Sequence, residues 1–442
     1  MSEDEELDDV DLEDLEEPVT MTPTSLGGAP RAASRDAALD SGIPILLLHR
    51  EHQNSALLRE VASEIQRTTS PTSLGTGWVI ELPRFKPSTS ATTEFDDLAG
   101  ISLRIADPVT YARRDQWGTM LLQERDGTNP SPTKTPGPLM TKNSIQWSYF
   151  NTPIPSPRDR WITQVLDAQR ESGANLLLTP GLPLESATPQ DSLDAAREDL
   201  DFCAGSLARG ERLAWNITVT HEWLTSARLR AMLLEEIVDS GHDVLYLRVK
   251  WPLAASTYAQ LLDADVLAGY KEISSLASDE QRTLLLPNTG GTGWINVALG
   301  ASGYGLGIGS RARAFATHRF APIGGGNPIP ARYFERRIMH TITKVVDDAL
   351  SGLPGYVACD CTFCDQLRSG ATWNQPLSGA HHVLLMAHET AVLTQSGARG
   401  PRGVARRRVR ECQQYVSAAG ATVPLVGADN PAHLASWSDL LR

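Results

Sequence analysis

Cys359, Cys361 and Cys364 stand at C-x-C-x2-C spacing in a chain that holds only five cysteines. Thiolates on a tight turn can converge on one tetrahedral ion, which needs a fourth ligand from elsewhere in the chain. His388, in an apolar stretch with a helical pattern, is the predicted fourth ligand, and His381 or His382 is the alternative. Four protein ligands close the coordination sphere, so we expect a structural zinc ion rather than a catalytic one.

Side chains able to do acid–base or ionic chemistry follow several predicted strands. The candidate catalytic residues are Asp107, His221 and Glu222. The candidates for binding substrate or phosphate groups are Arg248, Lys250, Asn288, Arg311 and Arg313. Breaking an N-glycosidic bond develops positive charge on the sugar, which a nearby carboxylate can stabilise. Acids, a histidine and several cations at one site would therefore suit a phosphorylated, base-bearing substrate.

Each of these groups also has a purely structural explanation. An aspartate before a proline, as at Asp107, commonly caps a turn. His221 and Glu222 can begin the next helix, where a glutamate favours the positive helix end. Arg311 and Arg313 lie on a glycine-rich turn, and glycines alone do not define a phosphate site. The sequence leaves both explanations open in each case.

Six arginines crowd the stretch Arg399–Arg410, and Arg406, Arg407 and Arg408 are consecutive. Clustered arginines suit contacts with phosphates that do not read base sequence. We therefore predict that this stretch contacts a nucleic-acid backbone. The alternative is the solvated face of a helix.

The net charge of −13 is concentrated at the N-terminus. Residues 1–20 carry eleven acidic residues and no basic ones, which leaves 42 acids against 40 bases elsewhere. This block is expected to be a disordered tail that either aids solubility or mimics nucleic acid. No apolar run is long enough to cross a bilayer, and no signal peptide is expected. These features predict a soluble cytoplasmic protein without a membrane partner, and they leave the oligomeric state open.

The elements that must position these groups alternate between short apolar strands and amphipathic helices. Strands are expected near residues 43–48, 78–82, 101–106, 174–179, 214–220, 244–249, 283–286 and 304–309. Such an alternation implies a parallel sheet buried on both faces. Eight units fit a closed α/β fold, the (β/α)8 TIM-type barrel, and an open doubly wound sheet is the alternative.

The predicted organisation has three parts. Residues 1–42 are a disordered acidic tail and linker, residues 43–330 the barrel, and residues 331–442 a C-terminal helical zinc-binding region. This last region is expected to begin with a helix over Pro330–Leu350. A long insertion at 108–160 interrupts the barrel, and its aromatic residues could form walls for a flipped base. These aromatic residues are Trp147, Tyr149 and Phe150.

A barrel followed by C-x-C-x2-C and then a histidine resembles the tRNA-guanine transglycosylase superfamily, which includes relatives acting on DNA. The resemblance implies that the three cysteines and His388 hold zinc in a subdomain packed on the barrel, where it helps to shape the nucleic-acid surface. Asp107 stands where the family's Asp-Ser-Gly-Gly-Phe-Gln motif begins, but the rest of that motif is missing. The family's nucleophilic aspartate has no counterpart in residues 305–313, and its Gly-Gly-Leu motif is not found in the expected strand context.

Keeping Asp107 without the second aspartate favours a hydrolytic glycosylase over base exchange. The predicted function is therefore a nucleic-acid base glycosylase that flips a modified base, from DNA rather than tRNA, and cleaves its N-glycosidic bond. Defence against phage is a natural role for such an enzyme. The alternatives are transglycosylase-like base exchange, a catalytically inactive barrel that binds nucleic acid, and an unrelated small-molecule barrel enzyme with an added zinc knuckle.

Overall fold

The structure is a computed structural model. It describes residues 34–50, 54–82, 94–95, 98, 100–112, 157–254, 260–309, 312–318, 331–369, 373–394 and 399–442. The acidic tail at 1–20, the three aromatic residues of the insertion, and Arg311 lie outside the described residues. The interpretations given to them stay predictions.

Eight parallel strands form a barrel in the order β3-β2-β1-β8-β7-β6-β5-β4. They are β1 (Ile45–Arg50), β2 (Gly75–Glu81), β3 (Leu103–Asp107), β4 (Leu177–Leu178), β5 (Leu213–Thr220), β6 (Val244–Ala254), β7 (Thr283–Leu286) and β8 (Gly303–Leu306). Strands β3 and β4 meet through backbone N–H groups of Asn175 and Leu176, which donate to the carbonyl oxygen of Arg104 at 2.9 and 3.3 Å. This nearly closed barrel confirms the predicted fold class and excludes the open doubly wound sheet.

Side chains alternate between the inside of the barrel and the layer beneath the helices, with the period of two that a strand imposes. Ile45 and Leu47 belong to the cluster of buried residues inside the barrel, whereas Leu46 belongs to the outer layer. At the carboxyl ends of the strands the same inward positions become polar, as at His49 on β1 and Asp107 on β3. The alternation therefore points polar groups into the mouth of the barrel, where barrel enzymes carry their active sites.

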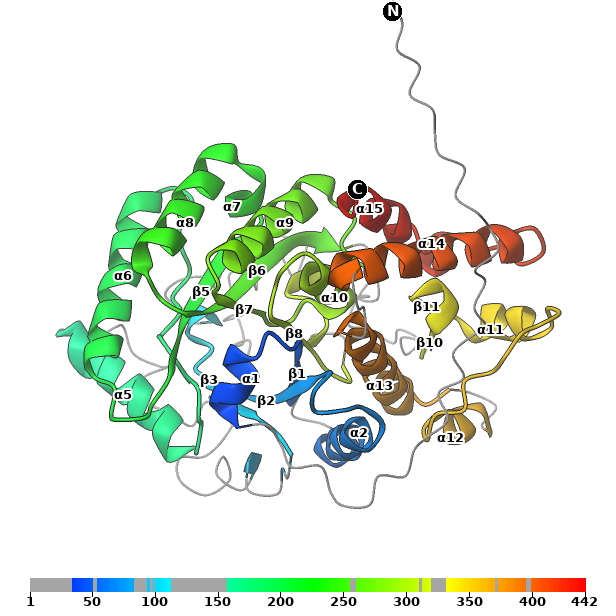
Figure 1. Ribbon diagram of the computed structural model, residues 1–442, viewed down its shortest axis with the longest axis horizontal. Helices are drawn as coiled ribbons and strands as arrows, with labels where there is room; N and C mark the ends of the chain where they lie inside the picture. Colours follow the sequence, from blue (N-terminus) through cyan, green and yellow to red (C-terminus); the bar gives the residue numbers. More distant parts are fainter. Residues whose placement is uncertain are drawn as a thin grey trace, which may run out of the picture.

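Helices cover the outside of the barrel (Figure 1). Those that lie between strands in the chain are α2 (Ser55–Thr68), α5 (Arg158–Glu171), α6 (Pro189–Gly205), α7 (Glu222–Thr225), α8 (Ala227–Ser240), α9 (Ala264–Asp279) and α10 (Gly290–Ala298). A short helix, α1 (Arg35–Asp40), precedes β1, and its Leu39 packs with the inner cluster of the barrel. The prediction that residues up to 42 are a disordered linker is therefore wrong for Arg35–Asp40, which form a helix. Ser34 caps α1 by accepting a hydrogen bond from the Ala37 N–H at 3.2 Å.

The C-terminal region supplies a helix to the barrel. Helix α13 (Gln375–Thr394) packs against both α2 and α10, in the place of the eighth barrel helix (Figure 1). The Trp294 indole of α10 donates to the carbonyl oxygen of Glu389 on α13 at 3.1 Å. Residues 331–442 therefore complete the barrel as well as carrying the cysteine cluster.

Residues 333–342 form an antiparallel hairpin, β10 (Tyr333–Glu335) and β11 (His340–Ile342), before helix α11 (Lys344–Ser351). The helix predicted over Pro330–Leu350 is thus wrong in its first half. Tyr333 and Phe334 bury into different clusters, as neighbours on a strand do. The other elements are α12 (Cys364–Ser369), α14 (Gly400–Gly420), α15 (His433–Leu440) and β9 (Ala316–His318), which pairs with β6. Among the helices that the structure describes, none is long and apolar enough to cross a membrane.

Candidate metal centre and barrel mouth

Three cysteines and His381 bring four ligand atoms together between the start of α12 and the first turns of α13. These Sγ and Nδ1 atoms all lie within 4.8 Å of one another. The Sγ atoms of Cys361 and Cys364 lie 3.2 and 3.4 Å from Nδ1 of His381, and 3.5 Å from each other. A tetrahedral ion with bonds of about 2.3 Å to sulfur and about 2.0 Å to nitrogen would separate its ligands by roughly 3.5–3.8 Å. With Cys359 as the remaining ligand, the group fits one tetrahedrally coordinated metal ion.

The hairpin β10–β11 orients His381 through the ring nitrogen that does not face the thiols. Nε2 of His381 lies 2.9 Å from the carbonyl oxygen of Phe334, an acceptor, so Nε2 carries the proton. Nδ1 is then left with a lone pair for the metal, the arrangement that outer-shell partners of metal-bound histidines impose. The Tyr333 ring stacks on the imidazole with centroids 4.4 Å apart. Both contacts hold the ligand in a metal-binding orientation.

His381 and not His388 completes the cluster, so the predicted fourth ligand is wrong and the alternative takes its place. His388 lies two turns further along α13, about 10 Å along the helix axis. Its Nε2 is 2.8 Å from the hydroxyl oxygen of Thr68 on α2. His382 stacks on Phe334 with centroids 4.5 Å apart. Residues seven apart share a helix face, so the sequence pattern could not tell which turn meets the cysteines.

At the mouth of the barrel, Arg248 on β6 reaches Asp107 at the end of β3. Nη2 of Arg248 donates to Oδ2 of Asp107, and the two side chains are 0% and 3% exposed. Burial by itself would lower the pKa of Arg248, but the charge of Asp107 and nearby tyrosines outweigh it and raise the pKa above its ordinary value. Arg248 is therefore a permanent cation. The structure brings these two predicted site residues into direct contact.

Aromatic rings surround this ion pair. The Arg248 guanidinium carbon lies 4.4 Å from the ring centroid of Tyr111 and 5.9 Å from that of Phe315, within the range of cation–π contacts. The Tyr246 hydroxyl donates to Oδ2 of Asp107 at 3.4 Å, and burial raises the pKa of this tyrosine well above its usual range. Rings of this kind exclude water, and charges act more strongly in such surroundings.

The turn after Asp107 is strained. Val109 has φ 52°, a left-handed conformation that β-branched residues avoid. Its N–H donates to Oδ1 of Asp107 at 2.9 Å, so the turn-capping explanation of this aspartate is confirmed. Backbone strain of this kind concentrates at active sites and ligand clamps. The same carboxylate therefore holds a strained turn and pairs with a cation inside the barrel.

His49 is a mouth residue that the sequence analysis did not select. It is 6% exposed, and its Nε2 has no hydrogen-bond partner within the described ranges. Gly305 on β8 makes room for the ring, because a Cβ there would lie 2.3 Å from Nε2. Burial and the charge of Arg248 lower the pKa of His49 to about 3, so the imidazole is neutral near pH 7. The period-two pattern of β1, read one residue beyond Leu48, would have found it.

Glu81 is a second residue that was missed. It ends β2 and pairs in register with Asp107 on β3. Neighbouring strands lie about 4.8 Å apart. Because Val79 belongs to the inner cluster, Glu81 lies on the same inward face, two residues on. Comparing the strand ends with one another would have placed these two carboxylates side by side.

Lys250 and Asn288 also lie at the mouth. Lys250 is two residues beyond Arg248 on the same face of β6 and is buried. Asn288 follows β7 with φ 55° and is half-buried. Arg313 instead turns back on the loop after β8, where its guanidinium donates to the carbonyl oxygens of residues 307–308. This arginine holds the loop in place.

His221 and Glu222 begin α7, as their structural explanation proposed. Glu222 is exposed, and its Oε2 accepts hydrogen bonds from the hydroxyls of Ser186 at 2.6 Å and Thr220 at 3.4 Å. Among the described contacts, none joins either residue to the pair of Asp107 and Arg248.

The consecutive arginines of α14 have different surroundings. Arg408 donates to both carboxylate oxygens of Glu389 at 2.9 and 3.0 Å, and that glutamate side chain is 1% exposed. Arg406 donates to the carbonyl oxygen of Leu441 at 3.1 Å. Arg407 is exposed and lies 3.7 Å from Glu411, beyond hydrogen-bond distance. Of these three predicted phosphate ligands, Arg407 is the one whose guanidinium is not committed to a hydrogen bond in the described part of the chain.

The fold and the cluster together define a (β/α)8-barrel protein with a candidate Cys3His metal centre. No protein-family model matches the sequence, and none of the curated proteins compared with it is significantly similar. The resemblance to the tRNA-guanine transglycosylase superfamily therefore rests on the barrel and the Cys3His cluster alone. Both features of the structure are consistent with that resemblance.

Proposed function

We propose that the protein is a nucleic-acid base glycosylase whose active site is the mouth of the barrel. The observation that supports this most is the buried pair of Asp107 and Arg248, beside the strained turn at Val109. Burying two charges is costly, and well-packed apolar residues of similar volume are often at least as stabilising, so a buried pair of this kind is a candidate for a functional role. A fixed carboxylate in aromatic surroundings is suited to stabilising a positive charge that develops on a sugar.

The reaction breaks the bond between the base and the sugar C1′ and forms a bond between C1′ and a water oxygen. The electron pair of the broken bond leaves with the base, which takes up a proton, and the water loses one. Asp107 faces the developing sugar cation, while the neutral His49 can hold the water through Nε2. Glu81, which pairs in register with Asp107, would accept the water proton. Direct attack by water needs no nucleophilic side chain, and the nucleophilic aspartate of the exchange enzymes has no counterpart here, which is why we favour hydrolysis over exchange.

Zinc is the ion that we assign to the Cys3His cluster. Thiolate and imidazole ligands in tetrahedral geometry are typical of structural zinc. Because all four ligands come from the protein, the ion would hold the hairpin β10–β11, α12 and α13 together without entering the chemistry. Since α13 packs as the eighth barrel helix, zinc would also stabilise the barrel.

DNA remains the favoured substrate over tRNA, and of the three consecutive arginines of α14 the exposed Arg407 is the best placed to contact its phosphates. Phosphate contacts position a protein on nucleic acid without reading base sequence. A modified base in foreign DNA, such as that of a phage, is the proposed target, because removing such a base needs hydrolysis alone and no base exchange.

A catalytically inactive, nucleic-acid-binding barrel is the second candidate. It is favoured by the low exposure of Asp107 and by the hydrogen bonds that occupy both of its oxygens. In that case the ion pair and the strained turn would serve stability alone.

The test is to incubate the protein with DNAs carrying different base modifications, and with tRNA, and to identify released bases by mass spectrometry. Release of a free base that Asp107→Asn strongly reduces supports the glycosylase. Retained binding without any release selects the inactive barrel. Incorporation of a labelled free base into the nucleic acid would select base exchange.

A further inference from the structure

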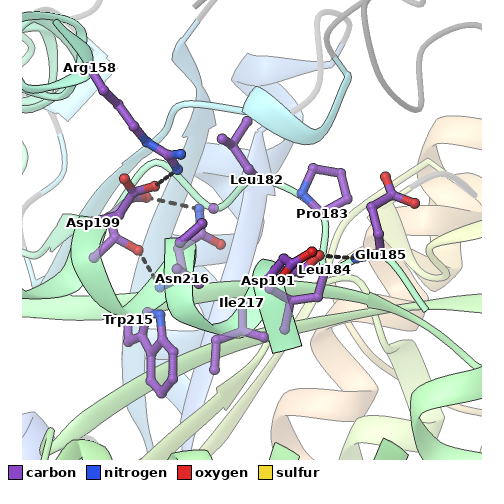
Figure 2. Close-up of a pocket in the computed structure, with 15 residues that line it drawn as sticks. Arg158, Leu182, Pro183, Leu184, Glu185, Asp191, Asp199, Trp215, Asn216 and Ile217 are labelled. Atoms are coloured by element: carbon purple, nitrogen blue, oxygen red, sulfur yellow. Dashed lines mark hydrogen bonds and ion pairs between the residues drawn. The ribbon is translucent and has the colours of Figure 1, made fainter. Parts of the chain in front are cut away.

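A cavity of about 190 Å³ lies beside β5, between the segment 179–185 and helix α6 (Figure 2). It is larger than the cavity of about 150 Å³ that holds one benzene molecule in an engineered protein. Residues from three elements line it, and Asp107, Arg248 and His49 are not among them. It is therefore a space separate from the proposed active site.

One end of the cavity carries two buried oxygen acceptors, from Asp199 on α6 and Asn216 on β5. Both residues are 3% exposed. Oδ2 of Asp199 accepts a hydrogen bond from Arg158 at 2.6 Å. Oδ1 of Asp199 and Oδ1 of Asn216 have no partner in the chain as described. Buried acceptors of this kind are costly to leave unpaired, and they invite a donor from outside the chain.

The direction of the Asn216 amide is fixed by its other contacts. Its Nδ2 donates to the carbonyl oxygens of Thr179 at 3.2 Å and Pro180 at 3.4 Å. Turning the amide over would set Oδ1 against those two carbonyl oxygens, so the observed orientation is the favourable one. Gly181, with φ 73°, permits it, because a Cβ there would lie 2.1 Å from Nδ2. The backbone is shaped to present this amide with its oxygen unpaired.

The charge of the lining is predominantly negative. Figure 2 shows Asp199 and Asn216 at one side of the cavity and Glu185 and Asp191 at the other, with Arg158 reaching in to Asp199. Among the described residues that line the cavity, Arg158 is thus the one cation, and it is paired. Burial raises the pKa of Asp199, and the ion pair with Arg158 opposes this shift without cancelling it. Most of the remaining lining residues are apolar, namely leucine, isoleucine, proline, alanine and tryptophan, and two are hydroxyl-bearing, Thr179 and Ser192.

From this geometry we infer that the cavity binds a small organic cation with an apolar body and at least two N–H donors, of the amidinium type. One N–H would meet Oδ1 of Asp199 and another Oδ1 of Asn216, while the apolar body would lie against the walls around Leu182 and Leu184. This inference does not depend on the proposed glycosylase function, because the two sites share no lining residue among those named.

Benzamidinium is a suitable probe, and acetophenone is its matched control. The two have similar size and shape, but acetophenone presents a carbonyl acceptor where benzamidinium presents N–H donors. Isothermal titration calorimetry and saturation-transfer NMR on the full chain should show binding of benzamidinium and none of acetophenone at the same concentration. No binding of benzamidinium, or equal binding of both, overturns the inference.

Two variants locate the binding. Asp199→Asn removes the charge and should weaken benzamidinium on the order of tenfold, the usual loss for a charge-assisted hydrogen bond. Ala195→Leu places a larger side chain in the lining and should abolish binding. Ala204→Leu lies on the same helix, exposed and outside the lining, and should bind like wild type. Because Ala195 is only half-buried, its variant should fold. Unchanged affinity in Ala195→Leu shows that the probe binds elsewhere and overturns the assignment.

Discussion

Arg248 and Asp107 are 141 positions apart in the sequence, yet their side chains form a direct ion pair inside the barrel. The pair joins β6 to β3, which are not neighbours in the sheet, and so it spans the mouth. Its carboxylate also accepts the N–H of Val109, whose left-handed backbone would otherwise be unsupported. The proposed catalysis, the backbone strain and the stability of the fold therefore all involve one side chain, and experiments on Asp107 must separate them.

Asp107→Asn should reduce base release by about 10²–10³-fold, the usual loss when one electrostatic stabiliser is removed from an active site. The asparagine oxygen can still accept the Val109 N–H, so the turn is kept. Arg248 would lose its counter-charge, which we expect to lower the free energy of unfolding by about 3–5 kcal/mol. Product analysis by mass spectrometry and urea unfolding at pH 7 measure the two effects.

The double variant Asp107→Asn with Arg248→Met separates stability from chemistry. It removes both buried charges, so most of the lost stability should return, while base release should stay low. A single Asp107→Asn protein that releases base at the wild-type rate would rule out the catalytic role of this carboxylate.

His381→Ala should abolish metal binding, whereas His388→Ala should retain about one metal ion per chain. The reason is geometric, because Nδ1 of His381 lies among the thiols and His388 contacts Thr68. Elemental analysis of the purified variants gives the metal content directly. Loss of metal from His388→Ala, with retention in His381→Ala, would restore the original sequence prediction.

Chelation of the metal should destabilise the whole barrel and not only the C-terminal region. The cluster anchors the beginning of α13, which packs against α2 and α10. Metal-binding energy is folding energy where the site does not exist in the unfolded chain. Hydrogen exchange with and without chelator should show faster exchange in α2 and α10. Protection unchanged in those two helices would show that the cluster is energetically independent of the barrel.

His49 should make the protein less stable in acid. Its pKa is about 3 in the folded state and about 6.5 when unfolded, so the unfolded chain takes up the proton first. Above pH 6.5 His49 is neutral in both states, and the full stability is present. As the pH falls from 6.5 towards 3, the free energy of unfolding decreases because only the unfolded chain takes up the proton. Between pH 7 and pH 5 this decrease amounts to about 2 kcal/mol. Urea unfolding of wild type and His49→Gln at both values should show a smaller decrease in the variant. Parallel decreases would mean that His49 is not buried in its neutral form.

Arg407→Ala should affect DNA binding, whereas Arg408→Ala should affect the stability of the fold. Arg407 is exposed, so its loss should weaken DNA binding and reduce the slope of log affinity against log salt by about one. Arg408→Ala removes one of the two arginines that contact the buried Glu389, so its main effect should be a lower melting temperature. Fluorescence anisotropy at several salt concentrations and thermal unfolding distinguish the two. Equal DNA affinity of Arg407→Ala and wild type at low salt would remove Arg407 from the proposed nucleic-acid surface.

The sequence by itself determined the barrel and the cysteines of the cluster. Apolar strands buried on both faces, alternating with helices, can be recognised because the periods of two and 3.6 are local properties of the chain. The C-x-C-x2-C spacing is local in the same way, since its thiols meet within one turn. Asp107 was found because it directly follows such a strand.

Only the tertiary structure decided the relationships between distant segments. His381 and His388 share a face of α13, and the docking of the hairpin β10–β11 selects the first of them. The hairpin itself was mistaken for a helix, because its short strands acquire their partners only on folding. Arg248 finds Asp107, and Glu81 lies beside it, through the order and register of the strands around the barrel. That order is set by the closure of the whole sheet, a property that no single stretch of sequence carries.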